Sequence, residues 1–134
     1  MEISEIDLQL VKAAFKALEN SYSPYSRFKV GAAVRSIDGS VFTGCNVENA
    51  SYGLTICAEL NAVYNMVTEG KSKIEAVAVV VDGGKIVTPC GACRQVIREF
   101  ADDDCPIICS SGGDFHIFRL GQLLPDSFNP SSLQ

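Results

Sequence analysis

Residues 57–59 read Cys-Ala-Glu and residues 89–93 read Pro-Cys-Gly-Ala-Cys, with the first cysteine of the second stretch 33 positions after Cys57. Cys90 and Cys93 are three residues apart, a spacing that brings two side chains to the same face of a helix. Three thiolates fill three corners of a tetrahedron and leave the fourth open, as in catalytic rather than structural zinc sites. The two stretches therefore predict a catalytic zinc site formed by Cys57, Cys90 and Cys93.

Each cysteine stretch lies where a loop is expected to enter a helix. The composition from Cys57 to Glu69 is helical, and Cys90 to Phe100 forms another expected helix. Backbone N–H groups without partners and the positive end of the helix dipole favour thiolate over thiol at such starts. Pro89 suits this boundary, because proline is tolerated at the beginning of a helix and not in its interior. We therefore expect the metal site to be built on two helix starts.

Glu59 lies two residues after the first predicted ligand. Because a fourth protein ligand would fill the position that water needs, we interpret Glu59 as a proton carrier. A Cys or His ligand, a non-ligating Glu and a Pro-Cys-x-x-Cys stretch are typical of zinc deaminases that attack C4 of cytosine. The alternative is a structural zinc site with Glu59 at the surface, but such sites normally have a fourth Cys or His ligand. The only histidine, His116, falls in a strand-like segment.

Length and charge narrow the class of protein. With 134 residues and 47% hydrophobic content, the chain suits a single domain spanning residues 1–134 that buries roughly two thirds of its unfolded surface. The formal charge of −5 disfavours a nucleic-acid partner, because binding to phosphates requires clustered Lys and Arg. We therefore expect a small-molecule ligand.

The N-terminal residues and the cysteine content predict a cytoplasmic protein. The chain begins Met-Glu-Ile-Ser-Glu without an apolar signal segment, and its longest apolar run, residues 76–81, is too short to span a membrane. No membrane partner is expected. In a reducing compartment, closely spaced cysteines favour metal binding or catalysis over disulfides. The remaining three are expected to be small buried side chains: Cys45, Cys105 and Cys109.

The rest of the chain alternates helical and strand patterns. Apolar residues at spacings of three and four predict a first amphipathic helix, capped by Ser4, with its apolar face formed by Leu8, Val11, Phe15 and Leu18. Alternation over residues 28–35, followed by Asp38-Gly39 and residues 41–45, predicts a β-hairpin. Further strands are expected at residues 75–81, 106–109 and 115–118, a helical turn at 120–124, and a loosely held tail at 129–132. The alternation predicts an α/β fold, a three-layer α/β/α sandwich.

Four stretches occur in the same order as in a known enzyme family. They are residues 23–33 (Ser-Pro-Tyr-Ser-Arg-Phe-Lys-Val-Gly-Ala-Ala), residues 45–49 (Cys-Asn-Val-Glu-Asn), the two cysteine stretches with Arg94-Gln95, and residues 123–125 (Leu-Leu-Pro). Over nearly its whole length the chain resembles the small three-cysteine cytidine deaminases. The resemblance implies a mixed central sheet of about five strands. It also implies one zinc ion per subunit and hydrolytic deamination of cytidine and 2'-deoxycytidine to uridine and 2'-deoxyuridine with release of ammonia, in pyrimidine salvage.

The resemblance also implies substrate-binding residues. Asn46 and Glu48 would hold the ribose hydroxyls, which is reasonable because residues i and i+2 share one face of an extended segment. Phe28 would lie beside the pyrimidine, and Phe128 would close the base pocket of a neighbouring subunit in a homotetramer with shared active sites. From local sequence alone, Asn46 could instead form a turn, Glu48 could lie in solvent, and Phe28 could pack in the core.

The chain departs from many three-cysteine members at one position. Leu60 stands where they have an arginine that offsets the negative charge of the thiolates. Our hypothesis is that the helix dipoles, assisted by Arg94, replace that arginine. Three other functions stay open at this point: deamination of a different aminopyrimidine nucleoside, editing of nucleic acid, and a zinc-stabilised binding protein without catalysis.

Overall fold

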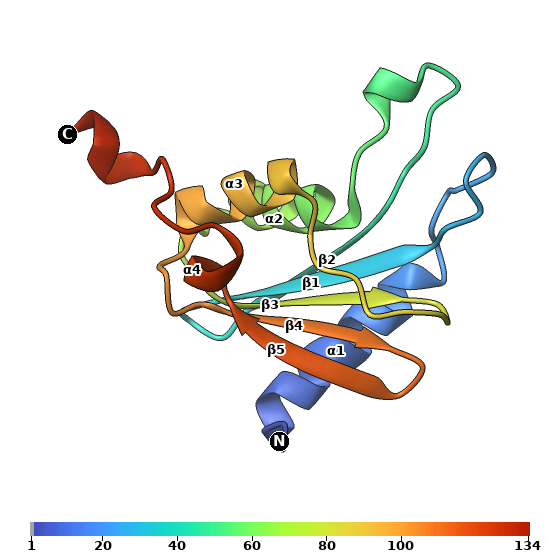
Figure 1. Cartoon of the computed structure of the whole chain (residues 1–134), viewed down its shortest axis with the longest axis horizontal. Helices are drawn as coiled ribbons and strands as arrows, with labels where there is room; N and C mark the ends of the chain where they lie inside the picture. The colour runs from blue at the N-terminus through green and yellow to red at the C-terminus, as the bar shows by residue number, and fades with distance from the viewer. Residues whose placement is uncertain (1) are drawn as a thin grey trace.

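Five strands form one mixed sheet in the order β2-β1-β3-β4-β5 (Figure 1). The structure is a computed structural model and describes residues 2–134. The first three strand pairs in this order are antiparallel, antiparallel and parallel, and β5 returns antiparallel to β4. The strands are β1 (Val30–Ser36), β2 (Val41–Cys45), β3 (Ile74–Val81), β4 (Pro106–Ser111) and β5 (Asp114–Arg119).

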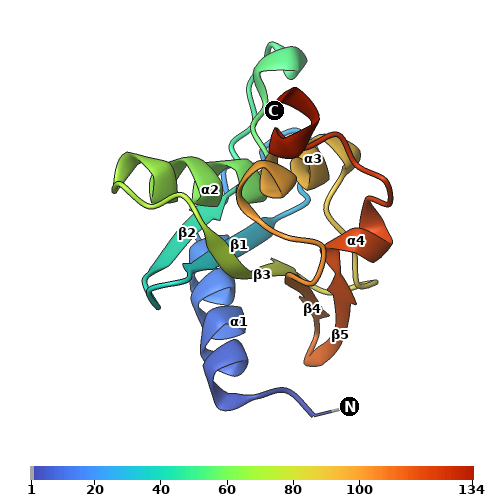
Figure 2. The ribbon, with the colours of Figure 1, turned by 90° about the vertical axis from the view of Figure 1, so that its left-hand side faces the viewer.

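Helices cover both faces of this sheet. Helix α1 (Glu5–Leu18) packs on one face, whereas α2 (Ala58–Thr68) and α3 (Gly91–Phe100) lie on the other (Figures 1 and 2). A short helix, α4 (Leu120–Leu123), follows β5, and 3₁₀ segments occupy Tyr52–Leu54 and Pro130–Leu133. The predicted three-layer α/β/α sandwich with a mixed five-stranded sheet is confirmed.

The buried face of α1 differs from the predicted one. Its buried residues are Leu10, Ala14 and Leu18, whereas Phe15 is 50% exposed. The cause lies in the sheet, because a Cβ added at Gly31 would lie 2.0 Å from the carbonyl oxygen of Ala14. The helix backbone approaches the strand so closely that a small residue must lie at the centre of its buried face.

Strand β1 is buried on both faces. Helices on either side of the sheet bury Gly31 to Ser36. Arg35 is among these residues, and its guanidinium donates to Asp7 at 2.9 Å and to Glu75 at 2.7 Å. A buried charge needs such partners. The two carboxylates thereby tie α1 and β3 to β1.

A second close backbone contact fixes α2. A Cβ added at Gly44 in β2 would lie 2.5 Å from the amide nitrogen of Ala62 and 2.6 Å from the carbonyl oxygen of Ala58. Only glycine allows the helix to lie so near the strand. Because Cys57 is the N-cap of α2, this contact also sets the height of that cysteine above the sheet.

The C-terminal residues are more regular than the sequence pattern predicts. Residues 130–133 form a 3₁₀ helix, and the Asn129 side chain caps it by accepting a hydrogen bond from the amide of Ser131 at 2.9 Å. The remaining cysteines follow the prediction in part, since Cys105 and Cys109 are buried and Cys45 is half-buried. Among the helices of residues 2–134, none is both long and apolar enough to cross a membrane.

Candidate active site

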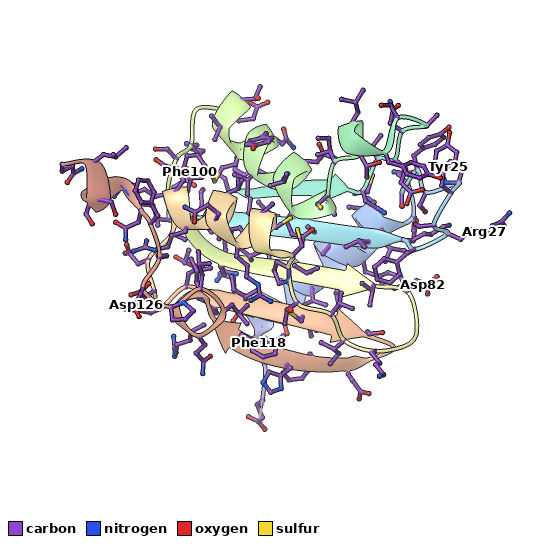
Figure 3. All side chains as sticks on the ribbon, turned by 45° about the horizontal axis from the view of Figure 1, so that its top comes forward. Tyr25, Arg27, Asp82, Phe100, Phe118 and Asp126 are labelled. Carbon is purple, nitrogen blue, oxygen red and sulfur yellow. The ribbon has the colours of Figure 1, made fainter. Side chains whose placement is uncertain are left out.

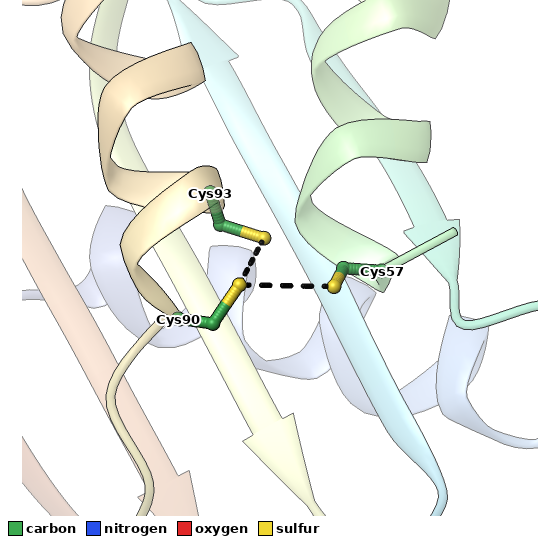
Figure 4. A group of neighbouring side chains, drawn as sticks. All are labelled: Cys57, Cys90 and Cys93. Atoms are coloured by element: carbon green, nitrogen blue, oxygen red, sulfur yellow. Dashed lines mark hydrogen bonds between the residues drawn. The ribbon is translucent and has the colours of Figure 1, made fainter. Parts of the chain in front are cut away.

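The three predicted ligand cysteines come together between two helix starts (Figure 4). Cys57 is the N-cap of α2, Cys90 is the N-cap of α3, and Cys93 lies in the first turn of α3. The Sγ atom of Cys90 is 3.9 Å from that of Cys57 and 3.4 Å from that of Cys93. All three sulfur atoms lie within 4.8 Å of one another.

These distances fit a zinc ion. Tetrahedral coordination with Zn–S bonds of about 2.3 Å places ligand sulfurs about 3.8 Å apart. All three cysteines are free thiols, so each offers its sulfur to a metal. Within residues 2–134 they are the only cluster of three or more His, Cys, Asp or Glu side chains with this convergence. The donor set is therefore compatible with zinc and leaves a fourth coordination position for another ligand.

The thiols influence one another's ionisation. Hydrogen bonding from Cys93, and to a smaller extent from Cys90, lowers the pKa of Cys57 to about 6. The same contact with Cys57, together with burial, raises the pKa of Cys93 above its ordinary value. The Cys57 proton therefore leaves readily, whereas Cys93 retains its own. Because metal binding requires thiolates, zinc affinity should rise with pH.

Glu59 projects from the first turn of α2 and is only 5% exposed. Burial, with a smaller contribution from the negative charge of the Cys57 thiolate, raises the pKa of its carboxyl to about 7. A carboxyl that titrates near neutral pH suits a group that both accepts and donates a proton. The alternative in which Glu59 lies at the surface is excluded by its burial.

Two isolated β-bridges bring residues 46–48 next to the cysteine cluster. Val47 pairs with Tyr22 on one side and with Ile56 on the other. The Val47 amide donates to the Ile56 carbonyl at 3.0 Å, and the Ile56 amide donates back at 3.0 Å. Ile56 immediately precedes Cys57. The segment that carries Asn46 and Glu48 therefore runs beside the start of α2.

Asn46 holds the backbone on both sides of Lys29. Its side chain, in a residue that is 8% exposed, donates from Nδ2 to the carbonyl of Phe28 at 2.8 Å. Its Oδ1 accepts from the amide of Val30 at 3.0 Å and from the hydroxyl of Ser21. Asn46 therefore does more than form a local turn, because its side chain joins segments that are distant in the sequence.

Glu48 is also bound within the protein. Its Oε1 accepts from the amides of Tyr25 at 3.0 Å and Ser26 at 3.1 Å, and its Oε2 accepts from the hydroxyl of Ser26. These donors, with the Ser26 hydroxyl foremost, lower the pKa of Glu48. Tyr25, Ser26 and Glu48 line an open hollow together with Tyr52 and Thr55. Sequence reasoning missed Ser26, although a serine two residues before the aromatic residue was a visible signal for such a turn.

The two predicted aromatic residues lie apart. Phe28 is 46% exposed, which rules out a core role, and it lies in the segment held by Asn46 and Glu48. Phe128 is 61% exposed, and its carbonyl accepts from the side chain of Gln95 on α3 at 2.8 Å. The C-terminal segment lies at the opposite end of the molecule from the loop around residue 25 (Figure 1). One chain therefore gathers all the predicted site residues except Phe128.

Arg94 directs its hydrogen bonds to oxygens near the cysteine cluster. Its guanidinium donates to the carbonyl of Pro89 at 2.7 Å, the carbonyl of Leu123 at 2.7 Å and the hydroxyl of Thr88 at 2.8 Å. These three oxygens, rather than the sulfurs, take its hydrogen bonds. Arg94 therefore holds the loop that leads into Cys90, and a contribution of its charge beside that of the helix starts stays a prediction.

A thiolate-rich metal site at two helix starts, with a buried carboxyl beside it, defines the chain as a zinc-dependent enzyme of the hydrolase class. Residues 4–109 match the family described as the cytidine and deoxycytidylate deaminase zinc-binding region. The chain belongs to this family, which confirms the resemblance inferred from the motifs.

Individual relatives are similar to this chain in sequence over almost its whole length. A cytidine deaminase of Halalkalibacterium halodurans is 46% identical over 92% of this chain and 95% of its own length. A cytidine deaminase of Mycobacterium tuberculosis is 42% identical over 96% of this chain and 95% of its own. The crystal structure of cytidine deaminase from Burkholderia pseudomallei has a TM-score of 0.86 at 43% identity, covering 94% of this chain and all of that one.

Proposed function

We propose that this protein deaminates free cytidine and 2'-deoxycytidine by hydrolysis, giving uridine and 2'-deoxyuridine and releasing ammonia. The observation that carries the proposal is the buried carboxyl of Glu59 beside three convergent cysteine sulfurs. Relatives at 42–46% identity over nearly the full chain are named cytidine deaminases, which supports the choice of substrate. A role in pyrimidine salvage follows from the free nucleoside substrate.

Cys57, Cys90 and Cys93 would hold one zinc ion per subunit, which supplies Lewis-acid activation of the attacking water. Glu59 would take a proton from that water and deliver it to N3 of the pyrimidine as oxygen adds to C4. It would then carry the remaining proton from the new hydroxyl on C4 to the exocyclic amino group. The C4–N bond breaks, ammonia leaves, and the carbonyl of uridine remains at C4.

The nucleoside would lie over residues 46–48. Asn46 and Glu48 offer an amide and a carboxylate, which suit a diol. Nδ2 of Asn46 donates one hydrogen bond within the protein and Oε2 of Glu48 accepts one, so each atom keeps a second hydrogen-bonding capacity for a ribose hydroxyl. The exposed ring of Phe28 offers a flat apolar face to the base. The net charge of −5 disfavours binding of a nucleic-acid backbone, which requires a positively charged groove.

We further propose a homotetramer in which Phe128 closes the base pocket of a neighbouring subunit. Large exposed side chains near the candidate site and at the C-terminus support an interface, among them Tyr52 at 75%, Leu54 at 63% and Phe128 at 61%. The six free cysteines support a reducing, cytosolic location.

The test compares zinc-loaded wild type with Glu59→Gln, following the ultraviolet change on deamination of cytidine. We expect activity to fall by about 10²- to 10⁴-fold in the variant while each protein keeps about one zinc ion per chain. Loss of zinc together with activity would instead make Glu59 a ligand. Zinc-loaded wild type without turnover of cytidine would reject this substrate and favour another aminopyrimidine nucleoside.

A further inference from the structure

Phe28 is held at both of its backbone polar groups by the residues proposed to bind ribose. Its carbonyl accepts from Nδ2 of Asn46 at 2.8 Å. Its amide donates to the hydroxyl of Ser26 at 3.0 Å, and that hydroxyl in turn donates to Oε2 of Glu48. A continuous path therefore runs from the Glu48 carboxylate through one hydroxyl to the backbone of the aromatic residue.

The segment between these residues needs such support. Arg27, which directly precedes Phe28, has φ of 58°, a left-handed conformation that is costly for a residue other than glycine. Figure 3 shows its side chain extending away from the body of the protein, so the side chain does not anchor the turn. A strained backbone persists only where its surroundings hold it. The Ser26 hydroxyl and the amide of Arg27, which donates to the Ser23 carbonyl at 3.0 Å, supply this support.

Ser26 is the only side chain that joins Glu48 to Phe28 in this path. Its oxygen accepts from the amide of Phe28 while its proton goes to Glu48, so both capacities of the hydroxyl are used. The bond to an ionised carboxylate is stronger than a neutral one. Ser26 also fixes the direction of the Glu48 carboxylate, because Oε1 is held by two amides and Oε2 by the hydroxyl.

We propose that Ser26 is a positioning residue that couples recognition of the ribose by Glu48 to packing of the base by Phe28. This inference rests on the proposed function. Loss of the hydroxyl would release the Phe28 amide and one oxygen of Glu48 together. The misplaced Phe28 ring and the misdirected Glu48 carboxylate would both weaken nucleoside binding, whereas the three ligand cysteines and Glu59 would stay in position.

The test measures KM, kcat and zinc content for wild type, Ser26→Ala and Ser26→Thr. We expect Ser26→Ala to raise KM for the nucleoside about five- to tenfold, within the range for the net effect of one hydrogen bond. We expect kcat to stay within about twofold and zinc content to stay unchanged, because Ser26 does not touch the reacting atoms. Ser26→Thr keeps the hydroxyl and should keep a KM close to that of wild type. Ser72→Ala, at an exposed serine in the loop before β3, is the matched control.

A double-mutant cycle with Glu48→Gln tests the coupling itself. We expect Ser26→Ala to raise KM by less than about twofold in the Glu48→Gln background, because one path is already broken. Additive effects would overturn the proposal, as would an unchanged KM in Ser26→Ala or an equally raised KM in Ser26→Thr. A joint fall of kcat and zinc content would overturn it in favour of a role in folding alone.

The measurement uses whichever aminopyrimidine nucleoside the wild type deaminates. Failure of the proposed function would appear as zinc-loaded wild type that leaves cytidine unchanged. Failure of the present inference would appear as active wild type whose KM does not depend on the Ser26 hydroxyl. The two failures are therefore separate observations.

Discussion

Glu48 keeps a charged carboxylate at the surface, where three donors from Tyr25 and Ser26 surround it. The Ser26 hydroxyl is the largest cause of the lowered pKa of this group. A lowered folded-state pKa means that the charged form is favoured by folding. At the scale of single residues, the carboxylate is thus a structural partner of the loop at residues 23–28 as well as a proposed ligand for ribose.

The acid dependence of stability should reveal this role. The contribution of Glu48 is fully present above its unfolded pKa of about 4.3 and is lost as pH falls through the lower folded value. Wild type should therefore melt at a higher temperature than Glu48→Gln near pH 7, and the difference should shrink below about pH 4. Thermal melts of both proteins across pH 3–7 check this. A difference that grows on acidification would contradict the lowered pKa.

The sequence predicted the role of a residue where that role depends on neighbours close to it in the chain. The three-residue spacing of Cys90 and Cys93 predicted that they share a helix face, because a helix start fixes its own first turn, whereas Cys57, 33 positions earlier, was assigned from the motif. The partners of Arg94 were not predictable in this way, since Leu123 lies 29 positions further along the chain. The ribose and base roles of Asn46, Glu48 and Phe28 stay predictions, although the structure places all three around one loop.

At the scale of elements, close backbone contacts decide where the helices lie. Gly31 admits α1 and Gly44 admits α2, one on each face of the sheet. The apolar spacing of α1 located the helix but not its buried face, because Ala14 must face the glycine while the larger Phe15 is left half exposed. The spacing of apolar residues therefore predicted where the helix lies in the sequence, whereas the close contact with the sheet determines which of its faces is buried.

Replacing Gly44 with alanine should move α2 and disturb the metal site. The added Cβ would meet backbone atoms of α2 at 2.5 Å and 2.6 Å, which cannot be relieved by a side-chain rotation. We expect Gly44→Ala to lower the free energy of unfolding by about 1–3 kcal/mol. Zinc affinity should fall with it, because Cys57 begins the displaced helix. Urea unfolding and competition with a chelator measure the two effects.

Gly53→Ala is the matched control for this substitution. A Cβ at Gly53 meets nothing within 4 Å, so its stability and zinc affinity should remain close to those of wild type. Equal behaviour of the two alanine variants would show that α2 tolerates the displacement.

At the scale of the whole molecule, the C-terminal segment and the loop around residue 25 lie at opposite ends (Figure 1). The metal cluster lies at the starts of α2 and α3, whereas the C-terminal segment is held further along α3 by Gln95 and Arg98. Phe128 therefore does not join the other site residues of its own chain. A neighbouring subunit would bring the ring to the site, in keeping with the proposed homotetramer.

Mixed assemblies test whether active sites are shared. Phe128→Ala should raise KM without loss of zinc, and Glu59→Gln should abolish turnover. In tetramers containing both variants, chains with intact Glu59 should receive intact Phe128 from their neighbours, so part of the activity should show the wild-type KM. Co-expression with two affinity tags isolates these assemblies, and sedimentation gives their size. Mixed assemblies that keep only the KM of Phe128→Ala would place the ring outside the neighbouring site, and a fully active monomer would reject the tetramer.

The sequence by itself determined the α/β/α fold class, because helix starts and apolar periodicity depend on residues close together in the chain. It also determined the ligand chemistry and the family, because the two cysteine stretches match a known motif. Only the tertiary structure decided which face of α1 is buried, that β1 is enclosed on both sides, and that Arg94 binds loop oxygens. It also joined Ser26, Glu48 and Phe28 into one hydrogen-bonded path. These features arise from contacts between distant segments, whose geometry is set by how closely backbones approach and not by any local pattern.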